Sequence, residues 1–478
     1  MRIALINPPS LFAYGKINTG HNCSFPLGLG YLASYVRQFG HQVALFDPEA
    51  SRSSFDRMWK QIDAFSPDLV GFTSVTPNFT VAGHLVDEAK RRLRCYVIMG
   101  GPHVTALPTT SLQVAPGLDA VIRGEGEIPL KVIAEQFDRH GKVDFHKVPG
   151  ATFYQDGAFQ KTPRPRPIED LDLIPFPARD LVDLSWYRLH AHFQRGKKSA
   201  TILFSRGCPS KCTFCANVVT GRRVRTASPR YFVDELEMLV NDHGIRHFHI
   251  VDDCFTADME KVEQICDLII AKKLPVTWFC FGRVDTLLDE QIVRKMKRAG
   301  CVYILLGVES GNQRILDIMK KGTRLDMIEE CCAVLRRVGI HYFNSFIIGN
   351  EGDTAETVGE TIDFAKRLRS VMAGFSILIP FPGTAIFGRY YREMDRPDTD
   401  WSSFCSVGDD VPYEPHHTEL SKGDILYLTA RAYKTYYFSI GQLMRILGFV
   451  KNPGIFLSYI RGAYGLGRQV LSWKRKTS

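Results

Sequence analysis

Three cysteines form the most informative group of reactive side chains in this sequence. Cys208, Cys212 and Cys215 follow one another with the spacing C-x3-C-x2-C. Thiolates on one tight loop can hold a metal, but three ligands leave one position open on a zinc ion or on one corner of a cubane cluster. A structural zinc would usually recruit a fourth ligand nearby, and neither Cys nor His occurs between Cys215 and His243. The spacing favours a cluster with one open iron, with structural zinc as the alternative.

Polar side chains follow several predicted strands in the same half of the chain. Asp252 and Asp253 come after one strand, Arg283 after the next, and Glu309 with Ser310 after the one that follows. In barrels of parallel strands the chemistry lies at the carboxyl ends of the strands. These residues are therefore candidate ligand contacts. The alternative is that Arg283 and Glu309 form an ion pair that stabilises the barrel mouth and contact no ligand.

These positions depend on a regular alternation of strands and helices after residue 200. Helix-length amphipathic segments separate short apolar runs. The expected strands are residues 201–204, 247–251, 276–281, 303–308, 342–348 and 374–379. Six such repeats predict a partial (β/α)6 barrel of the TIM type.

The first part of the chain shows the same rhythm with different loops. Short apolar strands alternate with helices, which predicts an open parallel sheet whose ligand lies outside the carboxyl ends of the strands. Glycines, prolines and small hydroxyls in these loops suit close approach to a flat or bulky ligand, although ordinary turns use them too. The candidate contacts are Pro8, Pro9, Ser74, Thr76, Gly100, Gly101, His103, Gly124, Glu125 and Gly126.

With 478 residues the chain is too long for one core, because single cores stop growing at about 250–300 residues. We predict an α/β protein in four parts. They are a Rossmann-like open parallel sheet at 1–143, a proline-rich linker at 144–195, the partial barrel at 196–390 and a mainly helical, basic and aromatic-rich C-terminal region at 391–478.

Composition and hydropathy exclude several classes of protein. With 45% hydrophobic and 23% charged residues, the chain is neither disordered nor a disulfide-rich miniprotein. No apolar stretch approaches the roughly 18–20 residues that span a bilayer. We therefore expect a cytoplasmic protein, in which cysteines are thiols or metal ligands.

The formal net charge of +9 is confined to the C-terminal end. No acidic residue follows Asp424, whereas basic residues interleave there with aromatic ones. Such a segment can contact anionic lipid at the inner membrane face or bind nucleic acid. It can equally be a helical cap on the barrel that turns its charge toward water.

The cysteine triplet, with Phe214 before its last member, resembles the signature of the radical S-adenosylmethionine (SAM) superfamily. The resemblance implies that the three cysteines bind a 4Fe-4S cluster, that the open iron chelates SAM, and that one electron cleaves SAM to a 5′-deoxyadenosyl radical. It also implies an electron donor such as flavodoxin or ferredoxin. The implied SAM contacts are Phe214, Asp252, Asp253, Arg283, Glu309 and Ser310. Asn350-Glu351 departs from the more usual Leu-Pro of this superfamily.

With the N-terminal loops added, residues 1–390 resemble the cobalamin-binding class of radical SAM enzymes. Many members carry a D-x-H-x-x-G motif that supplies a histidine to cobalt, and that motif is absent here. His21 and His103 are then the candidates for the corrin face. The resemblance nevertheless implies cobalamin, because relatives without the motif leave that face open or water-bound.

The expected function is methylation of an unactivated carbon on a small, amphiphilic or lipid-like substrate. Two alternatives stay open: a cobalamin-containing oxidative cyclase or rearrangement enzyme, and a metal-containing nucleic-acid-binding or tRNA-modifying protein. Nucleic acid is the less favoured partner, because the first part of the chain offers only Cys23 and Cys95 where tRNA methylthiotransferases need three clustered ligands. Among the other cysteines, Cys254 is the candidate for a role near the substrate.

Overall fold

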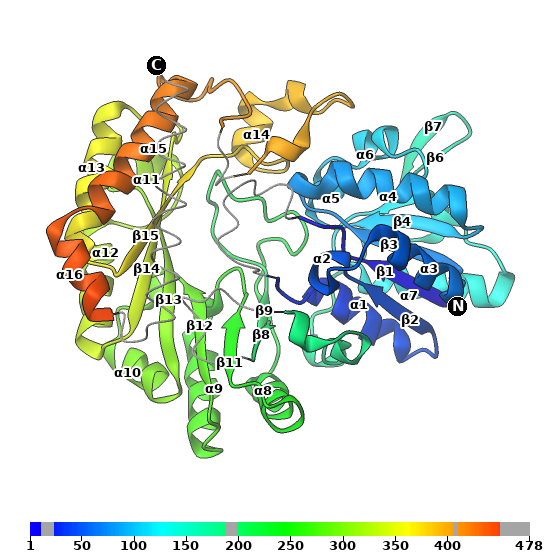
Figure 1. The fold of residues 1–478 in the computed structure, drawn as a ribbon, viewed down its shortest axis with the longest axis horizontal. Coiled ribbons are helices and arrows are strands. Elements are labelled where there is room, and N and C mark those ends of the chain that lie inside the picture. Colours follow the sequence, from blue (N-terminus) through cyan, green and yellow to red (C-terminus); the bar gives the residue numbers. More distant parts are fainter. Residues whose placement is uncertain (11–22, 188–197, 406–409, 450–478) are drawn as a thin grey trace.

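The computed structural model describes residues 1–10, 23–187, 198–405 and 410–449. It contains two mainly parallel sheets flanked by helices, the first on the right of Figure 1 and the second on the left. This confirms the predicted α/β class. The exact limits of the four predicted domains stay a prediction. Across the described residues we find no helix with the length and apolarity needed to cross a bilayer.

The first sheet has the strand order β2-β1-β3-β4-β5-β6-β7. Its parallel strands are β1 (Arg2–Ile6), β2 (Gln42–Phe46), β3 (Leu69–Thr73), β4 (Tyr96–Gly100) and β5 (Ala120–Ile122). The helices around it are α1 (Leu27–Arg37), α2 (Pro48–Ser51), α3 (Phe55–Phe65), α4 (Phe79–Arg92), α5 (Pro102–Ala106), α6 (Pro108–Val114) and α7 (Glu127–His140). Because helices cover both faces, the central strands are continuous apolar runs, as the sequence predicts.

Part of the predicted linker belongs to this sheet. β6 (Ala151–Gln155) and β7 (Ala158–Lys161) form an antiparallel hairpin that extends the sheet beyond β5. The turn is Asp156-Gly157, with both residues at positive φ, a pair typical of two-residue hairpin loops. No strand was predicted in this stretch, although the Asp-Gly pair is a sequence signal for a hairpin.

The second sheet has the sequential order β15-β14-β13-β12-β11-β8, and all its pairings are parallel. Its strands are β8 (Ser199–Ile202), β11 (His247–Ile250), β12 (Thr277–Gly282), β13 (Cys301–Glu309), β14 (His341–Ile348) and β15 (Met372–Ile377). The intervening helices are α8 (Pro229–His243), α9 (Met259–Ala271), α10 (Glu290–Arg298), α11 (Gln313–Ile318), α12 (Leu325–Val338) and α13 (Ala355–Leu368). The six predicted strands are therefore confirmed as a partial barrel.

Local sequence signals place the barrel helices. The side chains of Ser228, Asp258 and Thr354 accept hydrogen bonds from the first turns of α8, α9 and α13. Each satisfies one of the backbone N–H groups that a helix start leaves without a partner. These caps fix the residue at which each helix begins. They therefore set the length of the loops at the barrel mouth.

The edge of β15 is covered by α15 (Lys422–Tyr437), and α16 (Ile440–Phe449) follows. The Tyr437 hydroxyl receives a hydrogen bond from the Ala373 N–H (3.1 Å) and donates one to the Ala373 carbonyl (2.7 Å). The Tyr433 hydroxyl accepts one from the N–H of Phe375 (3.2 Å). Some of the aromatic residues noted near the C-terminus are therefore partners of a strand edge.

The chain also returns from the barrel to the first sheet. After α14 (Ala385–Tyr390), Trp401 is buried with its ring centroid 5.3 Å from that of His103 and 6.2 Å from that of Phe387. Thr110 donates a hydrogen bond to Asp395 nearby. Figure 1 shows α14 above the space between the two sheets. The two halves are therefore joined at this side by buried contacts as well as by the covalent chain.

Candidate active site

The cysteine loop begins directly after β9 (Ser205–Arg206), at the carboxyl end of the first barrel strand. Gly207 has φ +94°, and a Cβ there would lie 2.3 Å from the carbonyl oxygen of Arg223. Only glycine fits this turn. Backbone hydrogen bonds then hold the loop, from Cys208 N–H to the Gly221 carbonyl (3.3 Å) and from Thr213 N–H to the Met319 carbonyl (2.9 Å).

The three cysteine side chains differ in exposure. Cys212 is buried, Cys208 is half-buried and Cys215 is exposed. Burial raises the pKa of the Cys212 thiol above its ordinary value, and the nearby ammonium of Lys321 offsets only part of that rise. Among the described residues, no three Cys, His, Asp or Glu side chains converge as the ligands of a single metal ion do.

Two buried or half-buried cations stand beside the cysteine loop. Lys321 Nζ lies 2.8 Å from Glu309 Oε1 and 5.9 Å from the Phe214 ring centroid. Arg283 donates to Ser210 Oγ (2.7 Å) within the loop and, through Nε and Nη2, to Asp285 (3.0 and 2.9 Å). Positive charge at this point stabilises thiolates. Arg283 and Glu309, expected as SAM contacts, are thus both engaged with side chains of the protein.

Lys321 was not among the predicted site residues. It follows Lys320 between two helices, which in a sequence looks like a pair of solvent-facing charges. Burial lowers the pKa of Lys321, but Glu309 and Cys212 raise it above its ordinary value. The ammonium is therefore held charged inside the barrel mouth. Ser310, predicted beside Glu309, is buried and shares a hydrogen bond with Thr361 (3.2 Å).

The two predicted aspartates after β11 have different surroundings. Asp252 is buried and accepts hydrogen bonds from Phe204 N–H (2.8 Å) and Ser205 Oγ (2.5 Å). Burial raises its pKa to about 7. Asp253 is exposed and accepts a hydrogen bond from Thr220 (3.3 Å). Asp252 therefore fixes the start of the cysteine loop, whereas Asp253 is open to a ligand.

Cys254 follows the aspartates and is buried. Its sulfur lies 3.9 Å from Thr256 Oγ1. Burial raises the pKa of its thiol to about 11, and Cys208 adds to that effect. The side chain therefore lies near the cysteine loop as a neutral thiol, and its role near a substrate stays a prediction.

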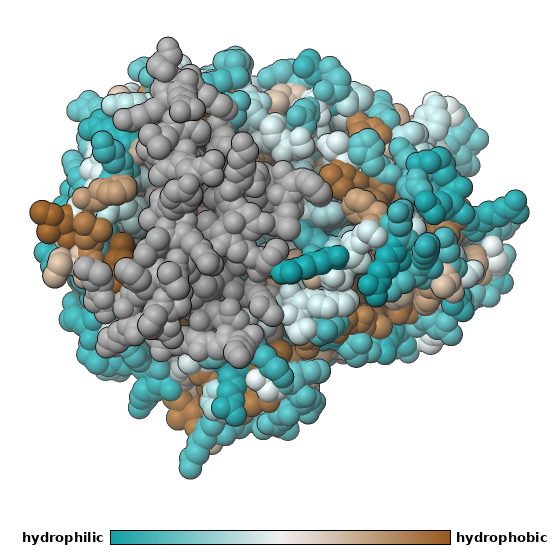
Figure 2. All heavy atoms as spheres, in the orientation of Figure 1, coloured by the Kyte–Doolittle hydropathy of each residue, from teal (hydrophilic) through white to brown (hydrophobic). Residues whose placement is uncertain are grey.

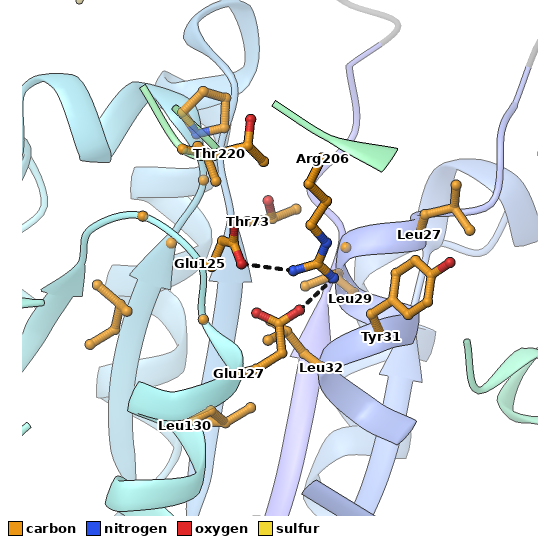
Figure 3. Close-up of a pocket in the computed structure, with 18 of the residues that line it drawn as sticks. Leu27, Leu29, Tyr31, Leu32, Thr73, Glu125, Glu127, Leu130, Arg206 and Thr220 are labelled. Atoms are coloured by element: carbon orange, nitrogen blue, oxygen red, sulfur yellow. Dashed lines mark hydrogen bonds and ion pairs between the residues drawn. The ribbon is translucent and has the colours of Figure 1, made fainter. Parts of the chain in front are cut away.

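A cavity of about 490 Å³ lies between the first sheet and the barrel mouth. Its walls are mainly apolar, with Leu29, Leu32 and Leu130 on the side of the first sheet, as Figure 3 shows. The carboxyl ends of β3, β4 and β5 line it, as expected for an open parallel sheet. From the barrel side come Asp253 and the loop after the cysteines, including Asn217 and Thr220. The residues that flank the cysteine loop and the first sheet thus line one cavity.

Half of the predicted cobalamin contacts line this cavity. They are Gly100, Gly101, Gly124, Glu125 and Gly126. A Cβ at Gly101 would lie 2.5 Å from the Ser74 carbonyl oxygen, so the backbone itself forms the wall. The glycines therefore give a surface that a large planar ligand can approach closely.

The other predicted contacts lie outside the cavity wall. Pro8, Pro9, Ser74, Thr76 and His103 are all buried. His103 Nδ1 lies 3.2 Å from Thr76 Oγ1, and its ring stacks on Phe79 at 4.1 Å. Burial lowers the pKa of His103 to about 3. The second histidine candidate, His21, lies outside the described residues.

A buried ion-pair network joins the two halves at the cavity. Arg206 Nη1 lies 3.0 Å from Glu125 and Nη2 lies 2.7 Å from Glu127, as drawn in Figure 3. Arg225 also pairs with Glu125, and the Arg206 guanidinium lies 5.4 Å from the Tyr31 ring centroid. Burial lowers the pKa of Arg206, but Glu127 and Glu125 raise it above its ordinary value. Glu125 is thus committed to ion pairs in addition to lining the cavity.

Comparison with known proteins agrees with this geometry. Residues 202–365 match the model of the radical SAM superfamily, and residues 17–134 match that of the B12 binding domain. An uncharacterized methyltransferase of Pyrococcus horikoshii is 33% identical over 97% of this chain and 98% of its own length. An anaerobic magnesium-protoporphyrin IX monomethyl ester cyclase of Rubrivivax gelatinosus is 32% identical over 76% of this chain and 65% of its own.

The overall fold also matches that of a protein of known structure. The cobalamin-dependent SAM radical enzyme OxsB, with aqua-cobalamin and SAM bound, superposes with a TM-score of 0.74 and 17% identity over 99% of this chain and 71% of that one. The family models and the methyltransferase relative together favour the methyltransferase interpretation over the cyclase and nucleic-acid alternatives. The chain belongs to the cobalamin-dependent radical SAM methyltransferases, enzymes that use a 4Fe-4S cluster, SAM and cobalamin.

Proposed function

We propose that the enzyme methylates an unactivated carbon of a small amphiphilic substrate in the cavity between its two sheets. The observation that carries this proposal is that one cavity is lined both by the glycine-rich ends of β4 and β5 and by the residues that flank the cysteine loop, Arg206 before it and Ala216 after it. When bound, the cluster with SAM would supply a 5′-deoxyadenosyl radical and cobalamin would supply the methyl group. Flavodoxin or ferredoxin is the proposed class of electron donor.

The described contacts support separate roles for the residues at the barrel mouth. Cys208, Cys212 and Cys215 would hold the cluster. Phe214 and Asp253 are the proposed direct SAM contacts, since Asp253 is exposed in the cavity and carries the charge that suits an ammonium group. The remaining predicted contacts, Asp252, Arg283, Glu309 and Ser310, are bonded to other residues and would act on SAM through the shape of the mouth.

The first sheet offers a surface for cobalamin. Gly100, Gly101, Gly124 and Gly126 would lie against the cofactor, because a wall of backbone admits a large ring system closely. Apolar side chains around them exclude water. The buried His103 would support this wall from behind through its contacts with Thr76 and Phe79.

Metal analysis and product mass test the proposed function together. Anoxically purified, reconstituted protein is expected to contain iron, sulfide and cobalt, and to release 5′-deoxyadenosine from SAM under a strong reductant. Incubated with candidate amphiphiles, it should yield a product heavier by one methylene group. A product that has lost hydrogen without gaining carbon would instead identify a cyclase.

We further propose that the C-terminal end contacts an anionic membrane surface. Ile440, Met444 and Leu443 of α16 are exposed, Ile440 at 82%, and Phe438 just before the helix is 67% exposed. Figure 2 shows this apolar patch at the left edge of the molecule, where Figure 1 places α16. The sequence after α16 carries basic residues and no acidic ones. Apolar insertion combined with positive charge is the usual basis of interfacial anchoring.

Liposome flotation at physiological salt checks this membrane contact. The full-length protein should float with vesicles rich in phosphatidylserine and not with phosphatidylcholine vesicles. A chain ending at residue 449 keeps α15 and α16 but loses the basic tail, and it should float markedly less because each basic residue near the surface contributes about 1 kcal/mol. The matched change Phe438→Ser with Ile440→Ser tests the apolar part. Equal flotation of the full-length and the truncated chain with both kinds of vesicle would exclude the proposal.

A further inference from the structure

A second cavity, of about 320 Å³, adjoins the main one and has a different character. The two cavities share wall residues, among them Gly124, Asn217 and Thr220. Arg123, Arg164 and Arg166 line only the second one. We call this second cavity the arginine pocket.

The chain holds two of these arginines in place. Arg123 Nη2 donates to the carbonyls of Thr162 and Ala151, the latter at 3.4 Å, in the hairpin of β6 and β7. Arg164 Nη1 donates to the Val218 carbonyl at 3.0 Å, and its Cδ would be 3.7 Å from a Cβ on Gly124. Hydrogen bonds to backbone carbonyls therefore fix the guanidinium groups of Arg123 and Arg164, the first from the first half of the enzyme and the second from the barrel half.

No carboxylate of the described residues pairs with these three arginines. The acidic residues of the pocket, Glu125 and Glu127, are bound to Arg206 and Arg225 instead. Arg123 Nε is buried without a hydrogen-bond partner. Burial lowers the pKa of Arg123, and the nearby Arg164 lowers it further. Arg164 and Arg166 are exposed, so the pocket places three guanidinium groups side by side without a carboxylate of the described residues to neutralise them, an arrangement that suits an anion.

We propose that the arginine pocket binds an anionic phosphate or carboxylate group of the substrate, next to the cavity where its carbon would be methylated. This inference rests on the proposed function and adds a substrate class to it: an amphiphile with an anionic head. Planar guanidinium groups bind both kinds of oxyanion through paired hydrogen bonds. Cobalamin carries a phosphodiester of the same chemistry, so the test must separate the two sources.

Calorimetric titration with inorganic pyrophosphate is the direct measurement, on full-length reconstituted enzyme at fixed ionic strength. Wild-type enzyme should bind the probe saturably. The double change Arg164→Gln with Arg166→Gln should weaken binding by about tenfold or more, because it removes two guanidinium groups that would form charge-assisted hydrogen bonds with the anion. Arg139→Gln, an exposed arginine on α7 outside the pocket, should leave binding unchanged. No binding by wild-type enzyme, or equal binding by the double variant, would overturn the inference.

A second measurement identifies the source of the anion. Cobalamin and cobinamide, which lacks the phosphodiester, should each bind the double variant as tightly as the wild-type enzyme. A loss of affinity confined to cobalamin would assign the pocket to the cofactor and overturn the substrate assignment. Release of 5′-deoxyadenosine without substrate should persist in the double variant. If wild-type enzyme releases none, the proposed function fails, while the pyrophosphate titration still decides the inference.

Discussion

The Cys212→Ala enzyme is expected to contain no cluster and to release no 5′-deoxyadenosine from SAM. Cys212 is the buried member of the triplet, and Lys321 stands beside it as the charge that favours its thiolate. Removal of one of three protein ligands leaves an iron of the cluster without its thiolate. Iron and sulfide analysis, visible absorption and product chromatography together measure the loss. Cys208→Ala and Cys215→Ala should behave in the same way.

The control for this experiment is Cys95→Ser. Cys95 is half-buried in the first half of the chain and belongs to no cluster spacing. Its variant should retain iron, sulfide and SAM cleavage at wild-type levels. A Cys212→Ala enzyme with full iron content and normal 5′-deoxyadenosine release would disprove the assignment of the triplet.

The second large effect concerns stability. Arg206→Met should lower the free energy of unfolding by about 3–5 kcal/mol, because it leaves buried Glu127 without its partner. The methionine also loses the contact of the guanidinium with Tyr31. Urea unfolding followed by circular dichroism gives the difference. Adding Glu127→Gln to the same chain should recover part of the loss, since the orphaned charge is then gone.

Arg223→Met provides the matched comparison. Arg223 pairs with Glu169 at 2.9 Å, but the two side chains are 77% and 53% exposed. Its loss should cost no more than about 1 kcal/mol, as is usual for ion pairs in water. Equal destabilisation by the two substitutions would mean that the Arg206 network does not join the halves of the enzyme.

The main elements of the fold could be predicted because each is encoded by a local pattern. Barrel strands are compact apolar runs separated by amphipathic helices, and the observed strands begin or end within about two residues of the prediction. The hairpin at 151–161 was missed because its strands are only five and four residues long, and the outer one, β7, is an edge strand with no buried residue.

The site could be predicted only as far as chemistry follows from residue type and spacing. The three cysteines were proposed as cluster ligands from their spacing alone, without tertiary information. Asp252 and Asp253 are equivalent in sequence, and only the packing of β8 against β11 decides which one is buried. Arg206 pairs with Glu127 and Lys321 with Glu309, and neither partner is a close neighbour in the sequence. The residues next to these two cations therefore do not indicate that they are buried.

The tyrosines of α15 have a consequence for how the enzyme behaves in a crowded solution. A sheet edge with free N–H and C=O groups is a template for strand addition by a second chain. Phenol hydroxyls from Tyr433 and Tyr437 occupy those groups on β15. A chain cut before α15 would therefore be expected to self-associate through this edge and precipitate, whatever happens to its cofactors.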